Sequence, residues 1–164
     1  MICFEYLNKL EFSKFAHQIF DVLADNMTVI APTGNNREDD FKLWFEAVSS
    51  GLQRKEREIV LIKDKENLVG FFQYYTNEDT FMMEEIQIKF AYQGKGVFRE
   101  LYCFVLNNIN SELEFVEAYA NINNHKSICI LGKLGLSNIG LNKNGHSYHF
   151  KGEFADLLNW CENK

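Results

Sequence analysis

The chain has 164 residues, of which 46% are hydrophobic and 15 are phenylalanine, and it carries a net charge of −6 at pH 7. This is the length of one domain with an adequate core, and the composition excludes a disordered chain. The negative charge argues against a protein that binds the phosphate backbone of nucleic acid. No apolar run approaches the length that spans a membrane, so we expect neither a nucleic-acid nor a membrane partner.

The four cysteines, Cys3, Cys103, Cys129 and Cys161, are scattered and form no CxxC pair. The N-terminus shows no basic segment followed by an apolar core, as a signal peptide would. Such a pattern favours reduced thiols in the cytosol over a disulfide framework or a zinc site. We therefore expect a cytoplasmic protein without a metal site, in which Cys103 and Cys129 are small core residues of helices.

The first quarter of the chain predicts a strand followed by two helices. Residues 2–7 can form a short strand, and the apolar spacing over 12–23 predicts an amphipathic helix. The polar stretch 26–40 predicts a loop, at whose end Asp39 or Asp40 could cap the second helix.

Three strands are expected next. The runs 58–63 and 68–76 are strand-like, and the polar turn 64–67 between them is typical of a hairpin. A second turn at 77–79 leads into the apolar and aromatic run 81–90. These three strands are predicted to form an antiparallel meander.

The central part of the chain predicts a strand, a helix and a second strand. The strand 81–90 is followed by a glycine turn at 92–96 and by an amphipathic pattern over 98–109. Residues 115–120 are again strand-like. A strand–helix–strand order predicts that the two strands are parallel neighbours joined by a right-handed crossover.

The last part of the chain predicts a helix, a hairpin and a closing helix. Asn124 could cap a helix that ends at Gly135. A pair of strands is expected at 136–141 and 146–151, before a short helix around 154–161. The whole order predicts one mixed α/β domain.

The glycine turn is a candidate anion site. Gly94 and Gly96 feed the start of the predicted helix, where free N–H groups and the helix dipole favour a phosphate. Lys95 and Arg99 add positive charge there. The alternative is an ordinary turn between a strand and a helix, in which the glycines are needed only for steric reasons and the basic side chains are solvated.

Two motifs resemble those of the GNAT superfamily of acyl-CoA-dependent N-acyltransferases. Gln93-Gly-Lys-Gly-Val-Phe98 resembles its Gln/Arg-x-x-Gly-x-Gly/Ala motif. The stretch 124–136 more loosely resembles the pattern Asn-x-x-Ala-x-x-Leu-Tyr-x-x-Leu-Gly-Phe. The order of elements agrees as well. The resemblance implies a single N-acetyltransferase-like domain over residues 1–164, whose central parallel strands splay apart.

The resemblance further implies acetyl-CoA as co-substrate and no metal. Backbone amides of the glycine turn would hold its pyrophosphate, and backbone groups of the central strand would bind its pantetheine arm. The implied cofactor-binding residues are Ile86, Gln87, Ile88, Gln93, Gly94, Lys95, Gly96, Val97, Phe98, Arg99 and Asn124. Two positions depart from the pattern: Phe98 stands where the family prefers Gly or Ala, and Leu131 replaces a Tyr that protonates the leaving thiolate in many members.

Glu84 and Tyr119 are the candidate catalytic residues. An incoming amine must lose a proton before it attacks, and a carboxylate usually takes it. Glu84 and Glu85 are neighbours on a strand and should point to opposite faces. Glu84 shares a side with Ile86 and resembles the position of a base in some members. Tyr119 resembles an acid/base position, although a tyrosine there is often part of a pocket wall.

The acceptor pocket is expected between the first two helices with their loop, the turn after Thr76 and the last hairpin. Its candidate lining residues are Trp44, Tyr74, Tyr75, Tyr148, His146 and His149, with His125 nearby. The favoured function is direct acetyl transfer to a primary amine of a small molecule or peptide. The alternatives are a non-catalytic acyl-CoA-binding module and a nucleotide-binding protein, although the latter's Walker and Rossmann signatures are missing. An edge strand in the last hairpin also leaves a homodimer open.

Overall fold

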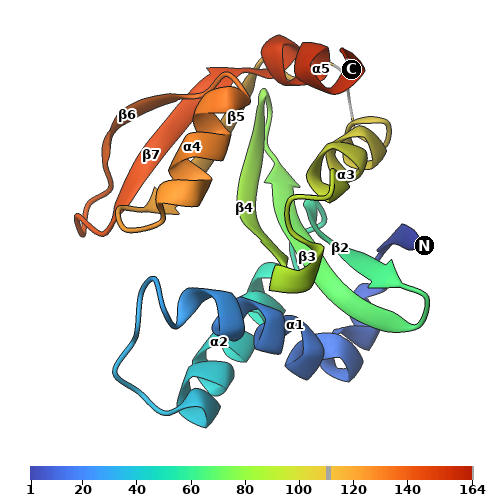
Figure 1. The fold of residues 1–164 in the computed structure, drawn as a ribbon, viewed down its shortest axis with the longest axis vertical. Helices are drawn as coiled ribbons and strands as arrows, with labels where there is room; N and C mark the ends of the chain where they lie inside the picture. Colours follow the sequence, from blue (N-terminus) through green and yellow to red (C-terminus); the bar gives the residue numbers. More distant parts are fainter. Residues whose placement is uncertain (110–111, 164) are drawn as a thin grey trace. The chain divides into compact units, whose positions relative to one another are not determined.

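The computed structural model describes residues 1–109 and 112–163, with the elements labelled in Figure 1. The strands are β1 (Ile2–Tyr6), β2 (Arg57–Asp64), β3 (Asn67–Thr76), β4 (Thr80–Ile88), β5 (Phe115–Asn121), β6 (Ser137–Leu141) and β7 (Ser147–Glu153). The α-helices are α1 (Phe12–Met27), α2 (Arg37–Gly51), α3 (Val97–Leu106), α4 (His125–Lys133) and α5 (Phe154–Glu162). The strands form one sheet in the order β1-β2-β3-β4-β5-β7-β6, which confirms the mixed α/β fold.

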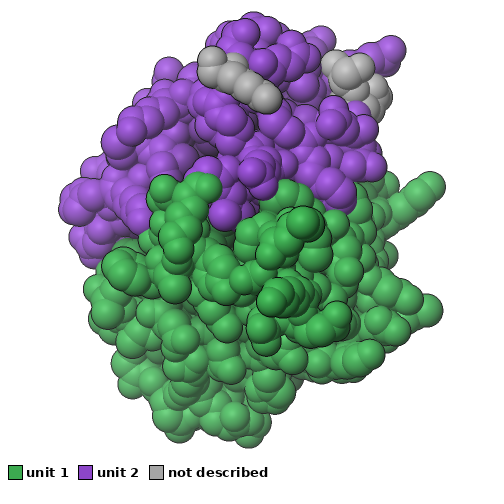
Figure 2. Space-filling view, turned by 45° about the vertical axis from the view of Figure 1, so that its right-hand side comes forward, with its two compact units in different colours: residues 1–74, 85–95 green, residues 75–84, 96–164 purple. Residues whose placement is uncertain are grey.

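The chain divides into two compact units, which Figure 2 shows in different colours. Unit 1 consists of residues 1–74 and 85–95, and unit 2 of residues 75–84 and 96–164. The chain passes from one unit to the other within β4, between Glu84 and Glu85, and again in the glycine turn, between Lys95 and Gly96.

In unit 1, β1 lies antiparallel to β2, with Ile2 opposite Asp64 and Tyr6 opposite Val60. The paired helices α1 and α2 pack on the strands through an apolar and aromatic core (Figure 1). The fully buried members of this core include Ile19, Ile59 and Phe71. Ring contacts of Phe12 and Phe20 in α1 with Trp44 in α2 help to hold the two helices together.

The loop between α1 and α2 is shorter than expected, because α1 continues to Met27 and α2 begins at Arg37. Asn36 is the N-cap of α2, and its side-chain oxygen accepts a hydrogen bond from the N–H of Asp39 (2.8 Å). The expectation that Asp39 or Asp40 caps the helix is therefore wrong. Both carboxylates lie in the first turn, where the helix dipole favours negative charge.

In unit 2, β4 pairs with β5 in parallel, from Thr80 opposite Phe115 to Met83 opposite Ala118. This pairing confirms the predicted strand–helix–strand unit around α3. β5 and β7 are antiparallel, and β6 pairs with β7 with an irregularity between Asn138 and Gly140. The predicted last hairpin is therefore present. The first strand of the crossover ends at Ile88 rather than at residue 90, where a short 3-10 turn begins.

Cys103 of α3 and Cys161 of α5 form a disulfide within unit 2. The expectation of four reduced thiols is therefore wrong for this pair. Cys3 and Cys129 are free, and Cys129 is exposed rather than a core residue. The 58-residue separation conceals the pairing in the sequence, because only the packing of α3 against α5 brings the two cysteines together.

Candidate functional site

The turn after β4 has the backbone geometry of a glycine turn that leads into a helix. Gly94 and Gly96 have φ angles of 73° and 80°, which residues with a side chain rarely adopt. A Cβ atom built on either glycine would meet no described heavy atom within 4 Å, so the space beside the backbone is open. The side-chain amide of Gln93 donates to the carbonyl of Ile88 (2.9 Å) and ties the turn to the end of β4.

Helix α3 begins directly after this turn, with Gly96 as an N-cap that supplies no side-chain hydrogen bond. The first N–H groups of a helix lack acceptors within the helix, and the helix dipole makes this end positive. Val97 is buried and Phe98 is half-buried, so bulky Phe98 is partly packed against the protein. The assignment of this helix start to the pyrophosphate of a coenzyme A stays a prediction.

The two basic side chains of the turn have different surroundings. The Arg99 guanidinium donates to the carbonyl oxygens of Trp160 (2.8 Å) and Asn163, and it lies 4.5 Å from the centroid of the Trp160 ring. It therefore binds the C-terminal end of α5, where the carbonyl groups carry partial negative charge. The Lys95 ammonium lies 5.9 Å from the ring centroid of Tyr92. Lys95 is thus the basic side chain of the turn that stays exposed.

The two adjacent glutamates of β4 fall in different units. Glu84 is half-buried at the end of the β4 segment of unit 2. Glu85 is half-buried in unit 1, where it lines a pocket beside α1. The assignment of Glu84 as base stays a prediction.

A relay of side-chain amides holds Glu85 in place. Gln87 Nε2 donates to Glu85 Oε1 (2.7 Å), and Asn26 Nδ2 donates to Gln87 Oε1 (2.9 Å) and to the Ile88 carbonyl (3.0 Å). The carbonyl oxygen of Ile88 thus accepts hydrogen bonds from both Asn26 and Gln93. These two bonds restrict its ability to accept a further hydrogen bond from a pantetheine arm. The sequence did not reveal Asn26 as a site residue, because it fell in a stretch predicted to be a loop.

Tyr119 lies on β5 in unit 2 with 47% of its surface exposed. Its ring stacks on that of His149 across the strand pair, with centroids 4.5 Å apart and planes at 15°. His149 Nε2 in turn lies 2.8 Å from Glu117 Oε1. The three side chains form a polar cluster on one face of β5 and β7. Tyr119 as a catalytic acid stays a prediction, and Glu117 is a partner that sequence reasoning missed.

The second motif folds as predicted around α4. The Asn124 side chain accepts from the N–H of Ser127 (3.2 Å), which confirms it as the N-cap of the helix. Leu131, at the position of the family's tyrosine, is buried. His125 and His146 are exposed. Among residues 1–109 and 112–163, no group of three or more His, Cys, Asp or Glu side chains could hold a metal ion.

A pocket of about 700 Å³ lies in unit 1 where α1, α2 and their connecting loop meet. Its lining residues are Phe20, Leu23, Ala24, Met27, Thr28, Ala31, Pro32, Thr33, Gly34, Asn35, Arg37, Asp40, Trp44 and Glu85. Trp44 and the first two helices with their loop were expected to line the acceptor pocket together with the turn after Thr76 and the last hairpin, but neither of the latter two lines this pocket. Of the other predicted aromatic residues, Tyr74 is buried and shares a hydrogen bond with Tyr6 (2.8 Å between hydroxyl oxygens), and it does not line this pocket.

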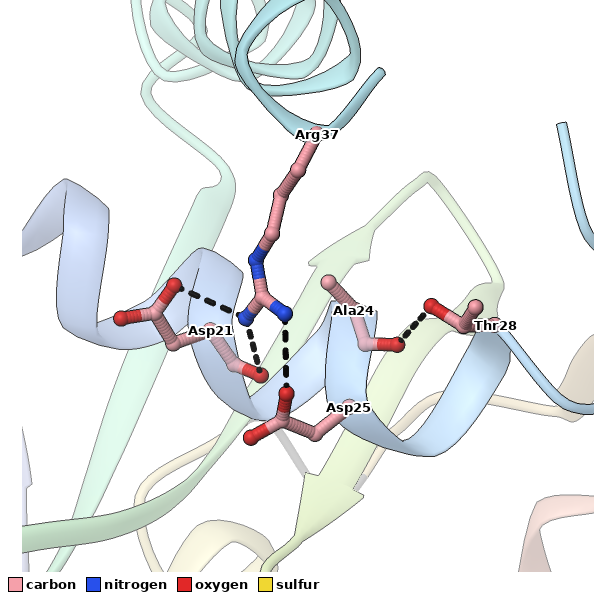
Figure 3. A network of polar contacts seen from close by, with 5 residues as sticks. All are labelled: Asp21, Ala24, Asp25, Thr28 and Arg37. Atoms are coloured by element: carbon pink, nitrogen blue, oxygen red, sulfur yellow. Dashed lines mark hydrogen bonds and ion pairs between the residues drawn. The ribbon is translucent and has the colours of Figure 1, made fainter. Parts of the chain in front are cut away.

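An ion-pair network joins α1 to the start of α2 (Figure 3). The Arg37 guanidinium donates to Asp25 Oδ1 and Asp21 Oδ1, both at 3.0 Å, so the start of α2 is tied to α1. The two carboxylates raise the pKa of Arg37 above its usual value. All three side chains are exposed, so this network positions the two helices more than it stabilises the fold.

Comparison with known proteins assigns the family. The family profile described as an acetyltransferase (GNAT) domain matches residues 7–137. The chain belongs to the GNAT acetyltransferase family. No curated protein matches the sequence.

Several solved structures share the fold of this GNAT chain. PaiA N-acetyltransferase from Thermoplasma acidophilum in complex with coenzyme A is 11% identical, with a TM-score of 0.77 over 94% of this chain and 99% of that one. A chimera of spermidine N-acetyltransferase SpeG from Vibrio cholerae and hSSAT is 18% identical, with a TM-score of 0.65 over 96% and 98%. At these identities the likeness concerns the fold, and it extends over both units of the chain.

None of the helices within residues 1–109 and 112–163 is both long enough and apolar enough to cross a membrane.

Proposed function

We propose that residues 1–164 act as one N-acetyltransferase, which transfers the acetyl group of acetyl-CoA directly to a primary amine of a small molecule or peptide. The observation that carries this proposal is the open, uncapped start of α3 behind two glycines with positive φ angles. This backbone stands at the motif position of a GNAT chain. The coenzyme A bound to the similar PaiA enzyme supports the same cofactor here.

In this mechanism the N–H groups that follow Gly96 bind the pyrophosphate, and the backbone of β4 orients the rest of the cofactor. Glu84 removes a proton from the incoming ammonium, directly or through water, because only the neutral amine attacks the thioester carbon. The nitrogen of the tetrahedral intermediate loses a second proton to water, and the intermediate then collapses to the amide as the C–S bond breaks and the coenzyme A thiolate leaves. Tyr119 is the proposed proton donor to that thiolate, since Leu131 has no proton to give.

We propose a primary amine as the acceptor and name no particular compound. The SpeG chimera carries the name of a spermidine N-acetyltransferase, which supports an amine as the acceptor class. The cytoplasm is the proposed location, and the Cys103–Cys161 disulfide is the observation that weighs against it. β6 ends the sheet with every residue exposed, so it is the proposed edge for a homodimer.

Buried Leu131 favours a second candidate, a non-catalytic module that binds acyl-CoA. The two functions differ in their products. Incubation with acetyl-CoA and a pooled set of primary amines, followed by mass spectrometry, should reveal an acetylated amine for the transferase. Acetyl-CoA binding without any acetylated amine would favour the module.

A further inference from the structure

The end of α5, from Trp160 to Asn163, is attached to α3 through residues that surround one cysteine. Cys161 forms the disulfide with Cys103 of α3. The carbonyl oxygens of Trp160 and Asn163, on either side of Cys161, accept hydrogen bonds from the Arg99 guanidinium. All of these residues belong to unit 2. The groups that hold Arg99 are therefore neighbours of the cysteine that the disulfide fixes.

The two halves of α5 are anchored differently. Phe154 and Leu157, in the first half, are fully buried. At the end of α5, Trp160 and Cys161 are only half-buried, and residues 162–163 are exposed. The core therefore keeps the first half of α5 in place, whereas the end of α5 depends on the disulfide and on its other contacts with α3.

Arg99 lies in the first turn of α3, close to the glycine turn, so a phosphate bound there and the end of α5 compete for its guanidinium. Its Nη1 donates to both carbonyl oxygens of the end of α5. The guanidinium also lies 4.5 Å from the centroid of the Trp160 ring, which meets the Tyr102 ring edge-on. An arginine binds phosphate through two parallel N–H donors, and one that is held at the end of α5 is not free to take up this geometry.

We propose that Cys103 and Cys161 form a reversible redox switch that sets the affinity for acetyl-CoA through Arg99. In the oxidised protein the disulfide fixes the end of α5, which holds the guanidinium away from the cofactor. In the reduced protein the end of α5 loosens, and Arg99 turns to a phosphate of the cofactor. The inference rests on the proposed function, because it requires that acetyl-CoA binds at the start of α3.

The chemical step is thiol–disulfide exchange with a dithiol reductant. The two sulfur atoms of the dithiol are oxidised to a disulfide, and its two electrons and two protons convert the S–S bond of the protein into two thiols. Cys103 and Cys161 are both half-buried, so the bond is within reach of a small reductant. Disulfides of cytosolic proteins are usually transient and often sense the redox state, so the switch agrees with the proposed cytoplasmic location.

Amide hydrogen exchange of the full chain tests the structural step without any ligand or variant. On addition of a dithiol, the amides of residues 160–163 should exchange at least about tenfold faster, because local opening becomes easier. Helix α4, which contains the free Cys129, is the internal control and should not change. Identical exchange of residues 160–163 in the oxidised and reduced proteins would overturn the inference.

Calorimetric titration with acetyl-CoA tests the effect on the cofactor. Reduction should tighten binding about tenfold, the usual value of one hydrogen bond to a charged group. Arg99→Gln should bind equally in both states, and Cys161→Ser should bind like the reduced protein whether or not a dithiol is present. A protein with both Cys3→Ser and Cys129→Ser is the matched control and should keep the full redox effect, because both thiols are free.

The outcomes separate the inference from the proposed function. An affinity that reduction leaves unchanged, or a redox effect that persists in Arg99→Gln, would overturn the inference while acetyl-CoA binding stands. A protein that binds acetyl-CoA in neither state would overturn the proposed function, and with it the effect of the switch on the cofactor. Hydrogen exchange would then still decide whether the disulfide controls the end of α5.

Discussion

The two units obtain their candidate functional groups in different ways. The candidate phosphate site at the start of α3 consists of consecutive residues, with Gly94 at the end of unit 1 and Gly96 at the beginning of the α3 segment of unit 2, and both glycines have positive φ angles. In unit 1, the pocket combines residues of α1, α2, their loop and β4. The candidate phosphate site is therefore encoded locally, and the pocket depends on tertiary packing. A turn can be recognised in the sequence, but a pocket built from distant segments becomes apparent only once the chain is folded.

Substitution of the proposed base should have the largest effect. Glu84→Gln should lower kcat by about 10²–10⁴-fold, the usual contribution of a general base, and leave acetyl-CoA binding intact. Glu85→Gln, on the opposite face of β4, is the matched control and should change kcat less than about tenfold. Steady-state kinetics of both variants make the comparison. If Glu85→Gln instead lost kcat and Glu84→Gln did not, the base would be Glu85.

The stability of unit 2 should depend on the oxidation of its two paired cysteines. Closing a long loop restricts the unfolded chain, so Cys161→Ser should lower the free energy of unfolding by about 2–4 kcal/mol. Denaturant unfolding without reductant measures the effect. Cys3→Ser and Cys129→Ser are the matched controls, because both thiols are free and exposed. Equal stability of Cys161→Ser and the controls would show that the disulfide is absent in solution.

Gly96→Val should weaken acetyl-CoA binding about 10- to 100-fold. Valine is strained at a φ of 80°, and its side chain enters the open space beside the helix start. Gly145→Val is the matched control, because Gly145 has a φ of 75°, equally open surroundings and a place in the β6–β7 turn. Calorimetry on both folded variants distinguishes strain from obstruction. Equal losses of acetyl-CoA affinity in the two variants would show that the glycine turn does not bind the phosphates.

Substitution of Tyr102 should have the smallest effect, a change in stability at alkaline pH. Burial raises the pKa of its phenol above the usual value near 10, so the folded protein keeps a proton that the unfolded chain loses. Stability should therefore be complete below about pH 10 and fall as the pH rises further. Tyr102→Phe should reduce this fall, at a cost of about 1 kcal/mol or less at pH 7 for the bond to Met83 Sδ (3.4 Å).

Denaturation curves between pH 8 and 11 test this expectation, with Tyr119→Phe as the exposed control. A steep alkaline loss of stability that persists in Tyr102→Phe would assign the titration to another group, such as Tyr74, whose pKa burial also raises.

Periodicity and turn chemistry predicted most of the fold, because each strand and helix carries its own pattern of apolar residues. The β4–β5 pairing and the Asn124 cap followed from local order. The Cys103–Cys161 disulfide and the contact of Arg99 with α5 did not, because each joins residues about 60 positions apart that only packing brings together. The relay through Asn26 depends on the last turn of α1, and helix ends are the least predictable part of an element.

The most direct test of the central claim is a titration with acetyl-CoA followed, on the same sample, by measurement of thiol release with primary amines. Our account predicts saturable binding, thiol release that requires an amine, and binding that is about 10- to 100-fold weaker in Gly96→Val but retained in Gly145→Val. No binding of acetyl-CoA to the folded protein would contradict the account. Binding without thiol release for any amine class would replace the transferase with the acyl-CoA-binding module.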